Sequence, residues 1–123
     1  MGEDIKILIV EDEILIAEDL RMILENEGYS VVGIPNNGND ALKLATQRFP
    51  EIIFMDINLK GEWNGIQTAE AIREAYPAII IYLTSCQDPP TLTQAEQSKP
   101  YKILTKFRKE EILETLTSLC STF

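Results

Sequence analysis

The stretch IIFMDIN, residues 52–58, runs four apolar residues directly into an aspartate, Asp56. Pro50 precedes this run and Gly61 follows it, and a short apolar segment with such boundaries is typical of a buried β-strand. The carboxylate at its end would lie at the rim of the hydrophobic core, where burying a charge is costly unless a partner compensates it. Asp56 is therefore the first candidate for a functional residue.

Four similar apolar runs occur elsewhere in the chain, and each of the five is followed by a segment in which apolar residues recur at helical spacing. Gly28, Pro50 and Pro77 are expected to end the first three helices. The fourth helix, at 91–97, has the weakest pattern. The strands are expected at 6–10, 30–34, 52–55, 79–83 and 101–105.

Strands that are apolar throughout and alternate with amphipathic helices predict a parallel sheet covered on both faces. Five such units are too few for a closed eight-stranded barrel, so the prediction is an α/β fold with an open, doubly wound, five-stranded parallel sheet. Neither a linker nor a low-complexity segment interrupts the 123 residues, and a single domain spanning 1–123 is expected. Sheets of this kind bind ligands beyond the carboxyl ends of their strands.

The composition restricts the classes of function. The apolar fraction of 45% and the charged fraction of 25% are those of an ordinary soluble protein. A formal net charge of −9 argues against direct nucleic-acid binding. The first residues, MGEDIK, do not form a secretory signal, and membrane insertion is not expected because every apolar run is shorter than the roughly 20 residues of a membrane helix. A cytoplasmic location is expected.

Polar residues that follow the predicted strands would meet at one edge of the sheet. Carboxylates gathered there would repel one another, and a divalent cation would relieve the repulsion; oxygen ligands without His or Cys favour Mg²⁺ over zinc. A hydroxyl and an ammonium facing the cation suit a phosphoryl group, which Asp56 would accept as a nucleophile. The set consists of Glu11, Asp12, Glu13, Asp56, Asn58, Thr84, Ser85 and Lys106.

These residues and their spacing resemble the receiver domains of two-component response regulators, over nearly the whole chain. The resemblance is carried by Glu11-Asp12, the segment DINLKGEWNG at 56–65, the LTS at 83–85, and Lys106. It implies a flavodoxin-like (βα)5 fold with strand order 2-1-3-4-5. It also implies that Asp56 is the phosphoacceptor, that Thr84 bonds a phosphoryl oxygen and that Lys106 pairs with the acyl phosphate. The implied Mg²⁺ ligands are Glu11, Asp12, Asp56 and the backbone carbonyl of Asn58.

The function implied by the resemblance is that of a signalling module rather than an enzyme. A sensor histidine kinase or a histidine phosphotransfer protein would donate the phosphoryl group to Asp56, and Mg²⁺-dependent autodephosphorylation would remove it. Output would pass through contacts with a downstream protein, without direct nucleic-acid binding, and weak homodimer formation is compatible with this role.

Three other functions are compatible with parts of the sequence. An aspartate-nucleophile phosphatase usually carries its nucleophile after the first strand, whereas Asp56 follows the third. A flavodoxin-like electron carrier needs a phosphate-binding loop after the first strand, where the three acids at 11–13 would repel a flavin phosphate. A degenerate receiver that binds partners without phosphorylation stays open. Taken singly, the acids at 11–13 are also explained as first-turn residues that interact favourably with the helix dipole.

Departures from the family pattern cluster near the fifth strand. Ile103 stands where the family commonly has an aromatic residue. This predicts a muted conformational response on the face formed by the fourth helix, the fifth strand and the fifth helix, which is called the output face below. Phe107 follows Lys106 where the family usually has a cis proline; a trans bond and a different loop path are expected there. Lys99-Pro100-Tyr101 imitates the family's Lys-Pro-aromatic motif but precedes the fifth strand, so we expect a surface turn. Ser85 is expected to cap the fourth helix.

Overall fold

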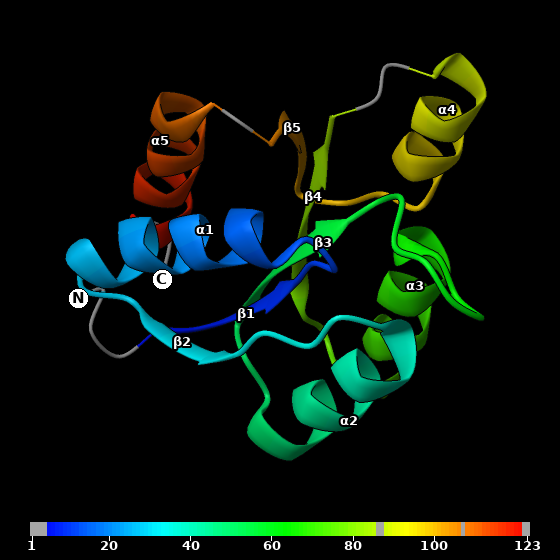
Figure 1. The fold of residues 1–123 in the computed structure, drawn as a ribbon, viewed down its shortest axis with the longest axis horizontal. Coiled ribbons are helices and arrows are strands. Elements are labelled where there is room, and N and C mark those ends of the chain that lie inside the picture. The colour runs from blue at the N-terminus through cyan, green and yellow to red at the C-terminus, as the bar shows by residue number, and fades with distance from the viewer. Residues whose placement is uncertain (1–4, 86–87, 107, 122–123) are drawn as a thin grey trace.

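The computed structural model describes residues 5–85, 88–106 and 108–121, which form a parallel sheet with helices on both faces (Figure 1). The strand order is β2-β1-β3-β4-β5, which confirms the doubly wound topology predicted from the sequence. The strands are β1 (Lys6–Val10), β2 (Ser30–Gly33), β3 (Ile52–Asp56), β4 (Ile79–Thr84) and β5 (Lys102–Thr105). The helices are α1 (Ile14–Asn26), α2 (Gly38–Arg48), α3 (Gly65–Ala75), α4 (Pro89–Gln97) and α5 (Lys109–Cys120).

Strand β3 lies at the centre of the sheet, between β1 and β4. Its side chains alternate between two cores, as strand geometry requires. Ile52 and Phe54 pack in the core formed with α1 and α5, whereas Ile53 and Met55 pack in the core formed with α2, α3 and α4. Figure 1 shows the same division of the helices between the two faces of the sheet. Both faces of β3 are therefore buried, which explains its uninterrupted apolar sequence.

Polar side chains and one glycine fix the helix boundaries next to the sheet. Gly28 has a φ of 92° directly after α1, a conformation that glycine adopts at no steric cost. The side chain of Asn37 accepts a hydrogen bond from the N–H of Asp40 at the start of α2. Asn64 and Gln67 form a reciprocal capping box at the start of α3. Helices α1, α2 and α3 end at Asn26, Arg48 and Ala75, each two residues before the predicted stop residue, so the predicted helix ends are confirmed.

Helix α4 begins earlier than the sequence pattern indicated, and Ser85 does not cap it. The N-cap is Asp88, whose carboxylate accepts hydrogen bonds from the N–H and the hydroxyl of Thr91. Pro89 and Pro90 occupy the first turn, where the N–H groups that proline lacks have no helical partner in any case. The prediction that placed these prolines before the helix, with Ser85 as its cap, was wrong for this reason.

The chain enters β5 through a turn, as the sequence predicted. Lys99 has a φ of 56°, and the N–H of Tyr101 donates a hydrogen bond to the carbonyl of Ile80 at 2.8 Å, which begins the pairing of this segment with β4. The Tyr101 side chain is exposed. The bond that joins Lys106 to Phe107 lies outside the described residues, so the trans bond stays a prediction. No helix in the described ranges is long and apolar enough to cross a membrane.

Candidate functional site

The carboxyl ends of four strands bring the predicted polar residues together. Glu11 follows β1, Asp56 ends β3, Thr84 ends β4 and Lys106 follows β5. All four side chains are buried, although three of them are ionisable. Parallel strands explain the convergence, because their carboxyl ends lie along one edge of the sheet. The structure thus places these four residues at one edge of the sheet, while their roles in phosphoryl transfer and metal binding stay predictions.

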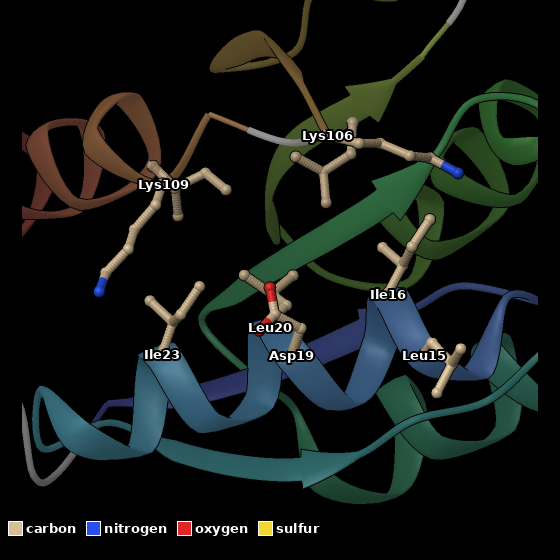
Figure 2. Close-up of a pocket in the computed structure, with 9 residues that line it drawn as sticks. Leu15, Ile16, Asp19, Leu20, Ile23, Lys106 and Lys109 are labelled. Atoms are coloured by element: carbon tan, nitrogen blue, oxygen red, sulfur yellow. The ribbon is translucent and has the colours of Figure 1, made fainter.

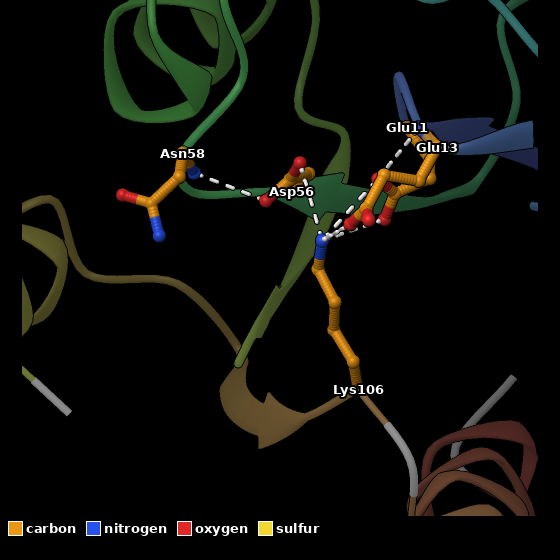
Figure 3. A network of polar contacts seen from close by, with 5 residues as sticks. All are labelled: Glu11, Glu13, Asp56, Asn58 and Lys106. Atoms are coloured by element: carbon orange, nitrogen blue, oxygen red, sulfur yellow. Dashed lines mark hydrogen bonds and ion pairs between the residues drawn. The ribbon is translucent and has the colours of Figure 1, made fainter. Parts of the chain in front are cut away.

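Three carboxylates surround the ammonium group of Lys106 (Figure 3). The Nζ atom lies 3.0 Å from Oε1 of Glu11, 3.3 Å from Oδ2 of Asp56 and 3.3 Å from Oε1 of Glu13. The contact between Lys106 and Asp56 was expected from the sequence. The contact with Glu13 was not, because Glu13 had been noted only as part of the acidic run after β1.

The two carboxylate oxygens of Asp56 have different neighbours. Oδ1 accepts a hydrogen bond from the backbone N–H of Asn58 at 3.0 Å, whereas Oδ2 faces the ammonium of Lys106. One hydrogen bond and one ion pair thus hold the carboxylate in one orientation. A nucleophile positioned in this way loses little conformational freedom when it reacts.

Glu11, Asp12 and Asp56 form an oxygen-rich cluster. One carboxylate oxygen from each lies within 4.8 Å of the others. Oε1 of Glu11 is buried and accepts no hydrogen bond from the residues that the structure describes, despite its proximity to Lys106. Within the described part of the chain this oxygen has an ion pair with Lys106 but no hydrogen bond, and a divalent cation would give it a further partner. These residues fit a hard divalent ion such as Mg²⁺, which prefers carboxylate and water oxygens.

A cleft of about 450 Å³ opens above this cluster. Thr84 is buried at the end of β4, and its carbonyl accepts a hydrogen bond from the N–H of Lys106 at 3.1 Å. This bond joins the ends of β4 and β5. The side chains of Ser85 and Lys60, which lie in exposed loops, extend the cleft toward solvent. The lining residues are Asp12, Glu13, Asp56, Asn58, Lys60, Ser85 and Lys106.

A second cleft, of about 320 Å³, lies between α1 and α5 (Figure 2). Its walls are mainly apolar, with Leu20, Leu83 and Ile112 among the lining residues. Lys106 lines both clefts, because its aliphatic stem passes the apolar one while its ammonium reaches the acidic one. Packing of this kind restricts a long side chain. It helps to explain why the Lys106 ammonium points at Asp56.

Burial and the neighbouring charges shift the pKa values of Glu11 and Lys106. Burial, together with the negative charge of Asp56, raises the pKa of Glu11 from 4.5 to about 7, although hydrogen bonds from Lys106 and the N–H of Glu13 oppose the shift. Burial alone would lower the pKa of Lys106, but its carboxylate neighbours outweigh this and raise it. Both groups therefore retain protons more strongly than they would in water.

The raised pKa of Glu11 predicts that the metal-free domain becomes less stable as pH rises from about 4.5 to about 7. In this window the folded protein holds a proton that the unfolded chain has released, so the free energy of unfolding falls as pH rises. Above about pH 7 this group causes no further change in the free energy of unfolding. The expected loss is on the order of 1–3 kcal/mol. Urea unfolding in EDTA between pH 4.5 and 8 measures this loss.

Saturating Mg²⁺ should flatten the pH dependence, because the ion competes with the proton for the Glu11 carboxylate. Glu11→Gln should flatten it without metal, whereas Glu25→Gln, at an exposed position in α1, should leave it unchanged. Equal slopes for the wild type and Glu11→Gln would contradict the assignment of the titrating group.

Sequence reasoning also missed a buried tyrosine in β4. Tyr82 is fully buried, and its hydroxyl lies 2.7 Å from Oγ of Ser98 at the end of α4. Oγ of Ser98 also donates to the carbonyl of Ala95 at 2.7 Å. Tyr82 pairs in register with Ile103 of β5. In the sequence, Tyr82 stands within the apolar run IIIYL at 79–83, so the run predicts only a buried strand. The available signal was the tyrosine itself, because a buried tyrosine hydroxyl generally needs a hydrogen-bond partner.

The fold and the acidic site define a known class of protein. Residues 7–117 match the family model of the response regulator receiver domain, and the chain belongs to this family. Receiver domains of two-component systems serve as phosphoacceptor signalling modules, interact with histidine kinases or phosphotransfer proteins, and typically bind Mg²⁺ at an acidic pocket. The resemblance inferred from the sequence is confirmed.

Similar proteins include response regulator GacA of Pseudomonas aeruginosa, 32% identical over 83% of this chain and 48% of that protein. Transcriptional regulatory protein PdtaR of Mycobacterium tuberculosis is 33% identical over 82% of this chain and 49% of that protein. The chain therefore spans about half the length of these curated relatives. Among solved structures, the signal receiver domain of a modulated diguanylate cyclase from Desulfovibrio desulfuricans G20 is 34% identical, with a TM-score of 0.87 over 94% of this chain and 93% of that one.

Proposed function

We propose that this domain takes a phosphoryl group from a phosphorylated histidine of a sensor kinase or phosphotransfer protein onto Asp56. The observation that carries the proposal is the position of the Asp56 carboxylate, which lies in the acidic cluster with Oδ2 at 3.3 Å from the ammonium of Lys106. A carboxylate oxygen attacks phosphorus, the bond from phosphorus to the histidine nitrogen breaks, and that nitrogen leaves with its electron pair, to be protonated from solvent. The product is an aspartyl phosphate.

The residues around Asp56 stabilise the charge that develops during transfer. The Lys106 ammonium faces the oxygen atoms of the arriving group, and the Thr84 hydroxyl donates a hydrogen bond to one of them. Glu11, Asp12, Asp56 and the backbone carbonyl of Asn58 would hold Mg²⁺, which would supply positive charge to offset the negative charge of the phosphoryl oxygens. Water then attacks phosphorus, the bond from phosphorus to the Asp56 oxygen breaks, and inorganic phosphate and a proton are released. The Asp56 carboxylate is regenerated, so the domain resets itself without acting on another substrate as an enzyme.

Incubation with acetyl phosphate and Mg²⁺, followed by intact-mass measurement, tests this function. The expected result is one labile phosphoryl group per chain, which is lost on further incubation with Mg²⁺ and retained longer in EDTA. Stoichiometric Mg²⁺ binding without any adduct would instead favour the alternative, a degenerate receiver that acts as a phosphorylation-independent interaction module. A partner kinase or phosphotransfer protein replaces acetyl phosphate as the donor in a second assay.

The response of the output face to phosphorylation is expected to be small. Ile103 is half-buried, packs against the core and faces Tyr82 across β4 and β5. Its side chain has no polar tip that gains or loses a hydrogen bond when Thr84 reorganises. Amide chemical shifts recorded before and after phosphorylation should therefore change strongly near Asp56 and weakly at Ile103. Large shifts at Ile103 and its strand neighbours would contradict this prediction.

A further inference from the structure

The environment of Lys106 is unusual because one of its three carboxylate partners lies outside the acidic cluster. Glu11 and Asp56 belong to the set whose oxygens fit a cation, but Glu13 does not. The side chains of Glu11 and Asp56 are 1% and 3% exposed, whereas that of Glu13 is 62% exposed. Glu13 is therefore the partner that can move with least disturbance to the core.

The direction of the Glu13 side chain is informative. Glu13 is the N-cap residue of α1, a position whose side chain commonly accepts hydrogen bonds from the first N–H groups of the helix. It makes no such bond here. Its carboxylate instead reaches a lysine that is 93 residues away in the sequence. The Glu13 side chain thus contacts Lys106 rather than the N–H groups of its own helix.

A cation bound to Glu11, Asp12 and Asp56 would compete with Lys106 for two of its three partners. The ion and the ammonium also repel each other at close range. Of the three carboxylates that contact Lys106, Glu13 is the one that lies outside the proposed set of ion ligands. It can therefore keep its contact with the ammonium while the ion is bound.

We propose that Glu13 is a positioning residue that retains the Lys106 ammonium when a divalent cation occupies the acidic cluster. This inference rests on the proposed function, because it takes Glu11, Asp12 and Asp56 as the cation site of a phosphoacceptor. Glu13 lowers the electrostatic cost of holding the ion and the ammonium together, and it leaves Lys106 poised over Asp56. Loss of Glu13 forces Lys106 back onto Glu11 and Asp56, where it opposes the ion.

A double-mutant cycle on Mg²⁺ affinity, measured by calorimetry without phosphodonor, tests whether Glu13 acts through Lys106. Glu13→Gln should weaken Mg²⁺ binding by about 3- to 10-fold, a range set by one charged contact with an exposed partner. In a Lys106→Met background the same substitution should change the affinity less than about twofold. Glu18→Gln, which removes the same charge from α1 beside Arg21, should also change it less than about twofold. An equal loss in both backgrounds would overturn the inference, and so would a wild type that binds no Mg²⁺.

A measurement on metal-free protein avoids the buried Lys106→Met substitution. The side-chain ammonium resonance of Lys106, followed by NMR with ¹⁵N-labelled lysine at one fixed pH, should move in Glu13→Gln and stay in place in Glu18→Gln. An unmoved resonance in Glu13→Gln would overturn the inference. If both measurements give the expected results but acetyl phosphate adds no mass, the proposed function fails while the role of Glu13 toward Lys106 and the cation stands.

Discussion

Replacement of Asp56 by asparagine is expected to abolish the phosphoryl adduct formed from acetyl phosphate and Mg²⁺. The amide has nearly the same size as the carboxylate, but its oxygen is a poor nucleophile at phosphorus. Loss of a nucleophile commonly lowers the rate of a covalent step by roughly a thousandfold or more. Intact-mass spectra over time should therefore show no adduct within the period in which the wild type is fully modified.

The fold should survive this substitution. Asp56 ends a strand that is held in register by β1 and β4, and its own backbone is paired with Leu83. Asp19→Asn, an exposed change on α1, is the matched control and should be modified at the wild-type rate. A labile adduct that forms equally fast in Asp56→Asn would assign the phosphoacceptor to another residue.

The parallel, doubly wound sheet was predictable because the strands carry the information locally, whereas the strand order 2-1-3-4-5 was implied by the resemblance to receiver domains. β3 has both faces buried, and this is recorded in the sequence as an apolar run without alternation. The same pattern in the other runs, each followed by helical spacing, leaves few arrangements of a parallel sheet. Asp56 was predictable as a site residue for the same reason, since a charge at the end of such a strand needs a function or a partner.

The start of α4 was predicted less well because two signals conflicted. Pro89 and Pro90 suggested a loop, whereas the structure uses both in the first helical turn, after the Asp88 cap. Proline is unfavourable inside a helix but well suited to its beginning, so the same residues support both readings. The N-cap residue decides whether the prolines precede the helix or begin it. Asp88, which directly precedes Pro89, indicates that they begin it.

The contact between Glu13 and Lys106 was not predictable from spacing. Three successive acids follow β1, and the helix dipole alone is enough to explain acidic residues at the start of α1. Which of the three turns toward the lysine depends on the backbone of the β1–α1 loop and on the rotamer of each side chain. Such a choice is made by packing among residues distant in the sequence.

Gly65, the first residue of α3, was overlooked for a related reason, since its role depends on backbone proximity rather than on its own conformation. A Cβ atom added at Gly65 would lie 2.1 Å from the backbone oxygen of Asp56. The N–H of Gly65 donates a hydrogen bond to the carbonyl of Ile57 at 3.0 Å, which draws the two segments together. The start of α3 is thus packed directly against the residue that carries the candidate nucleophile.

Gly65→Ala is therefore expected to destabilise the domain, even though alanine favours helices by about 1 kcal/mol over glycine. The clash is with backbone atoms, which cannot move aside as the end of a side chain can, so overpacking should outweigh propensity and leave a net loss of about 1–3 kcal/mol. Urea unfolding measures this loss as a lower midpoint. Gly33→Ala is the matched control, because its added Cβ would meet mainly the flexible end of Leu44, at 3.0 Å.

The same substitution should also affect the site, because α3 can accommodate a methyl group only by moving away from Asp56 or by displacing its backbone. Either movement changes the position of Asp56 relative to Lys106 and the acidic cluster. We therefore expect slower phosphorylation of Gly65→Ala at temperatures where it is still fully folded, with Gly33→Ala close to the wild type. Unchanged stability together with an unchanged rate would show that the α3 terminus does not support Asp56. A stability loss with an unchanged rate would confine the role of Gly65 to packing.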